Sequence, residues 1–193
     1  MIPDYTLDAD DLNDGIPIEY RGAKIMSDFQ EALNNKSTIL LLGAPGTGKT
    51  RQLWAAMLAQ RVKRCEDKLN KAAKSMDLPR GEWVRRQIGR DRVTIISEAA
   101  DLVPMRYEWS WLKDLTAIPD WLMIDDIGFI APTEWMRAAV YIIANERRAH
   151  GRPTVWTTNL TPDQLGEAYS PAIVSRLAGG AVLDLQGDDR RLS

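Results

Sequence analysis

The most specific motif of the chain is STILLLGAPGTGKT, residues 37–50. An apolar run passes into a loop with three glycines and ends in a lysine and a threonine. The spacing fits G-x-x-x-x-G-K-[ST], in which glycines let backbone N–H groups point inward at phosphate oxygens. A helical pattern follows, and the positive N-terminal end of a helix attracts an anion. The pattern predicts a phosphate-binding loop between a strand and a helix, with Lys49 on the β- and γ-phosphates and the Thr50 hydroxyl on Mg²⁺.

An acidic strand end supplies the predicted partners of this loop. WLMIDDIG, residues 121–128, is an apolar run that ends in Asp125 and Asp126. A carboxylate beside the loop can hold Mg²⁺, and the next one can orient the attacking water. We expect Asp125 with Thr50 at the metal and Asp126 with Lys49 in catalysis. The candidate contacts to ATP are Gly43, Ala44, Pro45, Gly46, Thr47, Gly48, Lys49, Thr50 and Arg51.

Short apolar runs alternate with helical patterns along the whole chain. The expected strands are residues 37–43, 93–96, 121–125, 154–158 and 181–185. Near-continuous apolar runs are typical of parallel strands that are covered on both faces. Helical patterns at about 50–64 and 133–150, and a short one that begins at Ser170, lie between the strands. The sequence therefore predicts an α/β fold with a five-stranded parallel sheet between two helical layers.

Composition limits the class of protein. With 193 residues, 45% of them hydrophobic, we expect one domain with a sizeable core. The net charge of −2 gives no overall attraction to nucleic acid or to a membrane. Cys65 is the only cysteine, so an internal disulfide is excluded. We see neither a signal peptide nor an apolar stretch of about 20 residues, and we expect a cytoplasmic location.

Charged residues are distributed unevenly along the chain. Residues 1–14 contain five aspartates and no lysine or arginine, and we expect them to form an acidic N-terminal tail. Residues 61–92 contain eleven lysines and arginines against five acidic residues. This segment exceeds the short connection that a strand–helix unit needs, so we interpret it as a basic helical insertion with a break at residues 79–81. We expect residues 15–193 to form the domain that carries the insertion.

Two later positions fit the chemistry of a nucleotide site. TVWTTNL, residues 154–160, places Asn159 at the carboxyl end of a strand, where an amide can bond the γ-phosphate or the attacking water. An ordinary loop asparagine is the alternative. SPAIVSRLAGG, residues 170–180, places Arg176 near the end of a short capped helix. An arginine there can neutralise the transition-state charge on a nucleotide held by a neighbouring subunit.

These motifs together resemble AAA+ ATPases, and more narrowly the DnaC/IstB-type group of bacterial and phage helicase loaders and transposition ATPases. The resemblance rests on an ordered set of segments across residues 15–191: GIPIEYRGA, GAPGTGKT, IDDIG, TTNL, SRLAGG and LDLQGDDRR. It implies a P-loop NTPase three-layer sandwich without a large C-terminal helical lid.

The resemblance also implies roles for individual residues. Asn159 corresponds to sensor 1 and Arg176 to the arginine finger. Either Arg190 or Arg191 would lie near the phosphates, and residues 16–20 would pass close to the adenine. The implied function is an ATP-hydrolysing helicase loader that forms homo-oligomers with shared ATP sites and has a replicative DNA helicase as its partner. The short chain suggests a phage protein in a bacterial host cell.

Loaders of this group bind single-stranded DNA, and one segment offers suitable side chains. Residues 100–115, ADLVPMRYEWSWLKDL, follow the second predicted strand. Aromatic side chains can stack on bases, and basic side chains can contact phosphates. The candidate DNA contacts are Arg106, Tyr107, Trp109, Trp111 and Lys113. Packing of the two tryptophans on the core is the alternative interpretation.

Three other functions use the same loop. A transposition ATPase would deliver target DNA to a transposase. A small-molecule kinase would need an acceptor site and usually an arginine-bearing lid over the phosphates, which the insertion at 61–92 does not supply in the expected place. A non-hydrolysing module would use ATP only to assemble, and a phosphate-release assay separates it from an ATPase.

Overall fold

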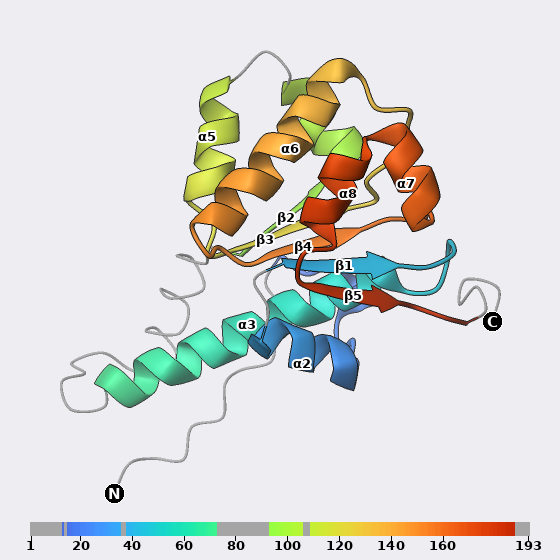
Figure 1. Cartoon of the computed structure of the whole chain (residues 1–193). Helices are drawn as coiled ribbons and strands as arrows, with labels where there is room; N and C mark the ends of the chain where they lie inside the picture. The colour runs from blue at the N-terminus through green and yellow to red at the C-terminus, as the bar shows by residue number, and fades with distance from the viewer. Residues whose placement is uncertain (1–12, 14, 36–37, 73–92, 106–108, 188–193) are drawn as a thin grey trace, which may run out of the picture.

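The computed structural model describes residues 13, 15–35, 38–72, 93–105 and 109–187, and its centre is one parallel sheet (Figure 1). The strands lie in the order β2-β3-β4-β1-β5. Their bounds are Thr38–Leu42 for β1, Val93–Ser97 for β2, Trp121–Asp125 for β3, Thr154–Thr157 for β4 and Ala181–Asp184 for β5. The five-stranded parallel sheet is confirmed, and each predicted strand agrees with the structure within one residue at each end.

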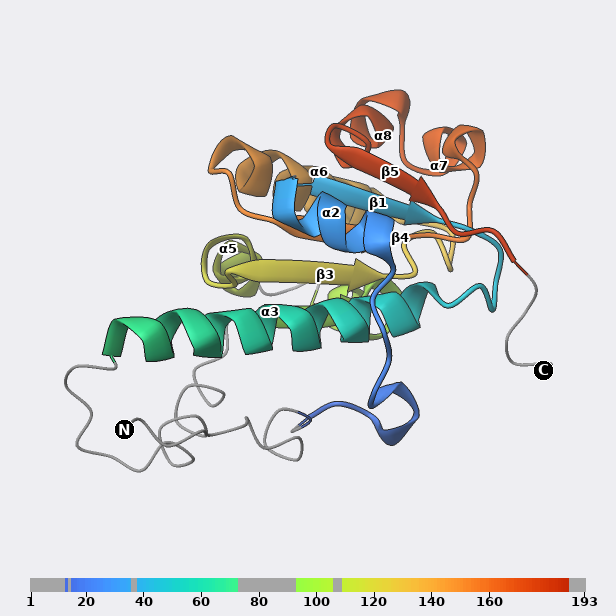
Figure 2. The ribbon, with the colours of Figure 1, turned by 90° about the horizontal axis from the view of Figure 1, so that it is seen from below.

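Helices cover both faces of the sheet (Figures 1 and 2). The helices on one face are α2, Ser27–Asn35, and α3, Lys49–Ala72. The helices on the other face are α5, Trp109–Ala117, α6, Glu134–Ala149, α7, Pro162–Ala168, and α8, Pro171–Leu177. Short helical turns are η1, Ile18–Tyr20, η2, Glu98–Leu102, and η3, Val103–Met105.

Strand β1 explains why the first apolar run is continuous. All five of its residues are buried. Ile39 and Leu41 belong to the hydrophobic cluster on the α2–α3 side, whereas Leu40 and Leu42 belong to the cluster on the opposite side. Successive side chains of a strand point to opposite faces, so a central strand needs apolar residues at every position. The strand is therefore held by two separate hydrophobic cores.

Capping residues define the helices on the second face. The Thr133 hydroxyl accepts from the Met136 N–H at the start of α6, and His150 ends the helix. The Ser170 hydroxyl accepts from the Ile173 N–H at the start of α8. Both starts are confirmed, because hydroxyl caps satisfy N–H groups that have no partner within the helix.

Three helices were not expected from the sequence: α2, α5 and α7. The described part of segment 100–115 contains η2, η3 and the helix α5. Trp109 and Trp111 are two residues apart, which does not fit the spacing of apolar residues on one face of a helix. Helix α5 was therefore not recognised from the sequence. Helix α7 has a Thr161 cap and a proline at its start, yet it extends for only seven residues. Short helices give too few residues for periodicity to detect.

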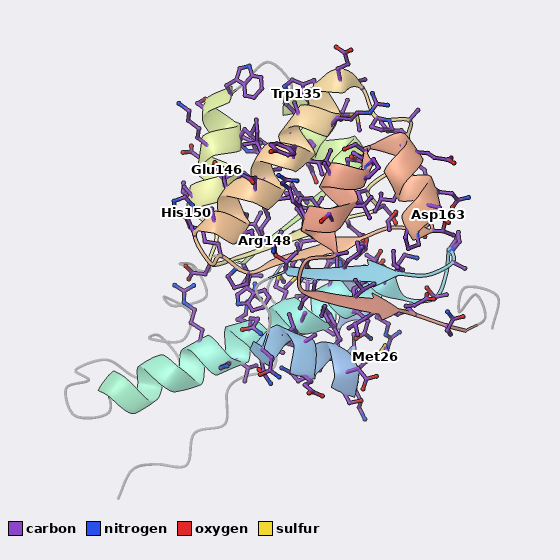
Figure 3. The ribbon with its side chains drawn as sticks, in the orientation of Figure 1. Met26, Trp135, Glu146, Arg148, His150 and Asp163 are labelled. Carbon is purple, nitrogen blue, oxygen red and sulfur yellow. The ribbon has the colours of Figure 1, made fainter. Side chains whose placement is uncertain are left out.

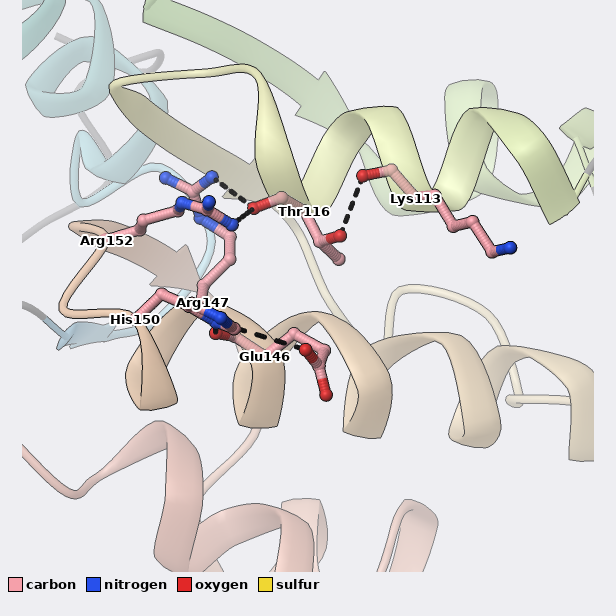
Figure 4. Close-up of polar contacts among 6 residues, drawn as sticks. All are labelled: Lys113, Thr116, Glu146, Arg147, His150 and Arg152. Atoms are coloured by element: carbon pink, nitrogen blue, oxygen red, sulfur yellow. Dashed lines mark hydrogen bonds and ion pairs between the residues drawn. The ribbon is translucent and has the colours of Figure 1, made fainter.

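One buried arginine joins the second helical layer to the sheet (Figure 4). Arg147 in α6 is 1% exposed. Its Nε donates to Thr154 Oγ1 at 2.8 Å, and its terminal nitrogens donate to backbone carbonyls at the end of α5 and before β4. Burial lowers the pKa of this guanidinium to about 10. Arg147 thus holds the end of α5 against the start of β4.

The architecture is a three-layer α/β sandwich of the P-loop NTPase fold. Within the described residues, which end at 187, no helix follows β5. Helix α3 continues to Ala72, so the first part of the predicted basic insertion, residues 61–72, is helical. The predicted break at 79–81 and the acidic tail at 1–14 fall outside the described residues, Asn13 excepted. Across the described chain, no helix combines the length and apolar character of a membrane span.

Candidate nucleotide-binding site

The phosphate-binding loop lies between the end of β1 and the start of α3. Gly43 has a φ of +148°, and a Cβ there would lie 2.6 Å from the Leu185 carbonyl oxygen. Only glycine fits so close a backbone approach in this conformation. The Leu185 N–H in turn donates to the Leu42 carbonyl at 2.8 Å. The residues after β5 therefore form one wall of the loop.

Lys49 lies inside the curve of this loop. Its Nζ donates to the carbonyl oxygens of Gly43 and Ala44 at 2.7 and 2.8 Å. The side chain is only 5% exposed. An ammonium group has three donors and no acceptor, so the loop carbonyls hold it in place until an anion competes for it. The lysine is thus positioned where the loop can bring a phosphate.

Thr50 and Asp125 meet directly, although 75 residues separate them. The Thr50 hydroxyl donates to Asp125 Oδ2 at 2.7 Å. The Thr157 hydroxyl donates to Asp125 Oδ1 at 2.5 Å. A hydroxyl and one carboxylate suit Mg²⁺, which prefers oxygen ligands and keeps several waters and phosphate oxygens. The two predicted metal ligands therefore fit the ion together, and Thr157 orients the carboxylate.

Asp126 adopts an unusual backbone conformation. Its φ is +55°, which costs a residue other than glycine about 1–3 kcal/mol. Its N–H donates to Thr157 Oγ1 at 2.9 Å, and its Oδ1 accepts from Asn159 Nδ2 at 3.2 Å. Because of this strained turn, the two consecutive carboxylates have different partners. Asp125 accepts from Thr50, and Asp126 accepts from Asn159. Asn159 and Asp126, predicted separately from two strands, contact each other.

Lys49, Thr50, Asp126 and Asn159 line one pocket of about 440 Å³. Its volume lies within the usual range for small-ligand sites. The lining residues are Glu19, Tyr20, Pro45, Gly46, Gly48, Lys49, Thr50, Arg51, Asp126, Phe129 and Asn159. Tyr20 stacks on Trp54 of α3, with ring centroids 6.0 Å apart. A flat aromatic surface therefore lies beside the phosphate loop, within the segment 16–20 that was expected near the adenine.

Arg176 lies apart from this pocket. Its Nη2 donates to the Tyr141 hydroxyl at 3.1 Å, and its guanidinium lies 4.5 Å from the centroid of the same ring. Its Nη1 donates to the Ala172 carbonyl at 2.9 Å. It lines a second hollow, between α6 and α8. Among the described residues, Arg176 therefore belongs to a different surface from the phosphate loop.

A buried carboxyl beside the site was not expected from the sequence. Glu98 is fully buried, and its carboxylate accepts from the Tyr169 hydroxyl and, at 2.7 Å, from the Gly128 N–H. Burial raises the pKa of Glu98 above the ordinary value of a glutamate side chain. Glu98 follows β2 directly, and Gly128 lies two residues after Asp126. The carboxyl thus holds the loop that carries Asp126 against the end of α7.

The candidate DNA-binding side chains on α5 lie in two different environments, one exposed to solvent and one against the core. Trp109 is 53% exposed and lies edge-to-face against Trp135, with centroids 6.4 Å apart. Trp111 packs against the hydrophobic core, and Lys113 is exposed. Residues two positions apart on a helix point in nearly opposite directions, so both tryptophans cannot face the core. Arg106, Tyr107, Arg190 and Arg191 lie outside the described residues.

Comparison with known proteins gives a consistent fold. No family model matches the chain, and no curated protein matches it either. Among solved structures, the DnaC helicase loader superposes with a TM-score of 0.61 at 14% identity, over 88% of this chain and 100% of that one. DnaI superposes with a TM-score of 0.59 at 17% identity, over 92% and 95% of the two chains.

A third similar structure is the replication initiator DnaA bound to AMPPCP and single-stranded DNA. The TM-score is 0.58 at 21% identity, over 82% of this chain. The present chain spans only 44% of the length of that DnaA chain. At these identities the likeness concerns the fold alone, and it agrees with the three-layer sandwich described above.

Proposed function

We propose that this chain is an ATPase that assembles on single-stranded DNA and loads or remodels a replicative helicase. The ATPase activity is supported by one observation: three segments that are far apart in the sequence meet at one pocket. The phosphate loop, the end of β3 and the end of β4 are joined there by the Thr50–Asp125 and Asp126–Asn159 contacts. A glycine-rich turn without nucleotide would not need these contacts.

Each residue then has a defined task. Lys49 exchanges its loop carbonyls for the β- and γ-phosphates, while Thr50 and Asp125 hold Mg²⁺. The ion supplies positive charge on the phosphate oxygens, which stabilises the transition state. Asp126 orients the attacking water, and Asn159 positions the Asp126 carboxylate and the γ-phosphate. Tyr20 contributes a flat surface for the base.

The helicase-loading part rests on the likeness to the DnaC helicase loader and to DnaI, which extends over almost the whole length of both chains. The DNA part is supported by the exposed Trp109 and Lys113 on α5. The trans role of Arg176 is supported by its place on a surface other than its own phosphate loop. An origin in a phage stays a prediction.

Phosphate release tests the ATPase. Lys49→Ala should abolish ATP binding, because it removes the charge that pairs the phosphates. Asp126→Asn should bind ATP like the parent and fail to turn it over, because an amide cannot orient water in the same way. Binding of a fluorescent ATP analogue and phosphate release, each with and without single-stranded DNA, measure both. Turnover by Asp126→Asn at the parent rate would show that another group orients the water.

Native mass spectrometry and pull-down test the remaining parts. We expect larger assemblies with a non-hydrolysable ATP analogue than with ADP, and further growth when single-stranded DNA is added. A pull-down against a replicative helicase and against a transposase separates the loader from the transposition ATPase. If the chain captures the transposase and not the helicase, the transposition ATPase becomes the supported function.

A further inference from the structure

The hollow between α6 and α8 contains two arginines. Its volume is about 510 Å³, and it is lined by Asn145, Arg148, Ala149, Ser175 and Arg176. Figure 3 shows Arg148 near the end of α6, on the side of that helix that faces α8. Of these two arginines, only Arg176 was a candidate site residue from the sequence. The structure places a second guanidinium in the same hollow, from a helix that precedes it by almost thirty residues.

Gly179 makes this arrangement possible. A Cβ at Gly179 would lie 2.4 Å from Arg148 Nη1 and 2.9 Å from Arg148 Cζ. The guanidinium of Arg148 therefore lies directly against the glycine backbone, in the space that any side chain would fill. The glycine after α8 thus has a steric role in seating Arg148 beside Arg176.

The two guanidiniums are not neutralised within the described chain. Arg176 bonds only uncharged groups, which are Asn145, Tyr141 and the Ala172 carbonyl. Arg148 forms no ion pair with any described residue. Two adjacent positive charges repel each other, and an anion between them removes the repulsion. Planar guanidiniums match the oxygens of phosphate or carboxylate in pairs.

The chain's own nucleotide cannot be this anion. Gly180 lies against the backbone of Thr38, the first residue of β1, whereas the phosphate loop follows the last residue of β1. Five strand residues at about 3.3 Å each put roughly 16 Å between the two edges of the sheet. An arginine side chain is too short to cover that distance, so the ligand must come from another molecule.

A second copy of this chain offers a fitting anion. Among the described residues that line its pocket, the cations are Lys49 and Arg51. They and one Mg²⁺ carry four positive charges against the roughly four negative charges of ATP, with Glu19 and Asp126 adding two more negative charges. Phe129 at the same pocket is 70% exposed, and Tyr141 beside Arg176 is 39% exposed. The pocket of one copy and the hollow of another thus complement each other in charge, and each has an exposed aromatic ring.

We infer that Arg148 and Arg176 form a two-arginine site for the terminal phosphate of the nucleotide that a second copy holds. Arg148 is thereby assigned as a further catalytic residue that acts in trans, seated by Gly179. The inference rests on the proposed ATPase function and adds to it the second arginine and its support.

Assembly with a non-hydrolysable ATP analogue tests the site directly. We expect Arg148→Ala and Arg176→Ala each to raise the protein concentration for half-assembly by about tenfold or more, because each removes a charged hydrogen bond. The double variant should lose less than the product of the two effects, because both groups bind one phosphate. Lys63→Ala, which removes an exposed charge from α3, is the control and should assemble like the parent.

A charge-preserving variant separates position from net charge. Gly179→Ala keeps both arginines, but its Cβ displaces the Arg148 guanidinium. We expect a loss of assembly smaller than that of Arg148→Ala. In all variants a fluorescent ADP analogue should bind with the parent affinity, because the chain's own pocket lies at the other edge of the sheet. This binding also verifies that each variant is folded.

The outcomes are distinct. Normal assembly and turnover by Arg148→Ala, together with failure of Arg176→Ala, overturns the inference and leaves the proposed function intact. A parent protein that binds the analogue without assembling overturns the shared site itself. Loss of single-stranded DNA binding by Arg148→Ala, with unchanged assembly, makes the hollow a site for the DNA backbone and overturns the inference as well.

Discussion

Arg147 and Arg148 are adjacent in the sequence, yet their side chains have opposite roles. Arg147 is buried, and its guanidinium satisfies carbonyl groups from the end of α5 and from the residue before β4. Arg148 is exposed and lines the hollow between α6 and α8. Helical rotation of about 100° per residue accounts for the difference, because neighbours on a helix face different surroundings. Residue type alone therefore does not reveal which arginine stabilises the fold.

Substitution of the two arginines should separate their roles. Arg147→Ala removes one partner of a buried hydrogen-bonded network and leaves carbonyl groups without donors. We expect the free energy of unfolding to fall by about 1–3 kcal/mol for each buried carbonyl group that is left without a donor. Arg148→Ala is the matched control, and its effect should stay within about 0.5 kcal/mol. Urea unfolding followed by circular dichroism measures both. Equal stability of the two variants would show that Arg147 does not stabilise the contact between α5 and β4.

At the scale of elements, the buried Glu98 connects three parts of the site. It follows β2, bonds the Gly128 N–H in the loop after β3, and accepts from Tyr169 at the end of α7. A Cβ at Gly128 would lie 2.5 Å from Leu160 Cδ1, so the same loop is also packed tightly against the residue after Asn159. The loop that carries Asp126 is therefore fixed from both sides, which explains how a strained aspartate keeps its position.

The pH dependence of stability should report on Glu98. Burial raises its folded-state pKa above 4.5, so the native state binds the proton more tightly than the unfolded state does. The stabilisation is complete below the unfolded pKa and is lost as the pH rises through the folded pKa. Relative to Glu98→Gln, the parent should lose about 1.4 kcal/mol for each unit of elevation.

Urea unfolding of the parent and of Glu98→Gln between pH 4.5 and pH 8 measures this loss. Glu167→Gln, at an exposed position in α7, is the control. A stability difference between the parent and Glu98→Gln that does not change over this interval would contradict an elevated pKa.

Helix α5 presents one tryptophan outward and one inward, and the two should respond differently. Trp109→Ala should weaken binding of single-stranded DNA by about 1–3 kcal/mol, because it removes one stacking surface. Trp111→Ala should instead lower the free energy of unfolding by roughly 1–3 kcal/mol, because its ring packs on the core. Fluorescence polarisation with a labelled oligonucleotide and urea unfolding measure the two effects. Unchanged DNA binding by Trp109→Ala would remove the α5 surface from the proposal.

At the scale of the whole molecule, the sheet separates two functional edges. The phosphate loop, Asp125 and Asn159 gather at the carboxyl edge, whereas Arg176 lies toward the amino edge on α8. Under the proposed function, Arg176 completes the nucleotide site of another copy, so the two edges of neighbouring copies pair. Pairing of unlike surfaces from identical chains is a head-to-tail contact, which produces rings or helical assemblies.

Mixing of two inactive variants should restore turnover. Lys49→Ala lacks a nucleotide site and keeps Arg176, whereas Arg176→Ala keeps the site and lacks the arginine. When the two are joined in one tandem chain, phosphate release should recover in part, because one interface combines both intact groups. Tandem Lys49→Ala and tandem Arg176→Ala chains are the controls. No recovery in the mixed tandem would show that Arg176 does not act in trans.

The parallel sheet and the phosphate loop could both be predicted from the sequence. Both depend on local patterns, since a central strand needs apolar residues throughout and the loop needs Gly43 beside a lysine and a threonine. Asp125 and Asn159 were also identifiable, because carboxyl ends of neighbouring parallel strands meet at one edge.

Only the tertiary structure revealed the contacts between distant segments. Glu98 with Tyr169, and Arg148 with Gly179, are brought together by packing of helices on the sheet, which no local pattern encodes. The orientation of Trp109 and Trp111 depends on α5 in the same way. Their roles follow from burial and from the neighbours that the fold supplies, and those neighbours are set by long-range packing rather than by sequence spacing.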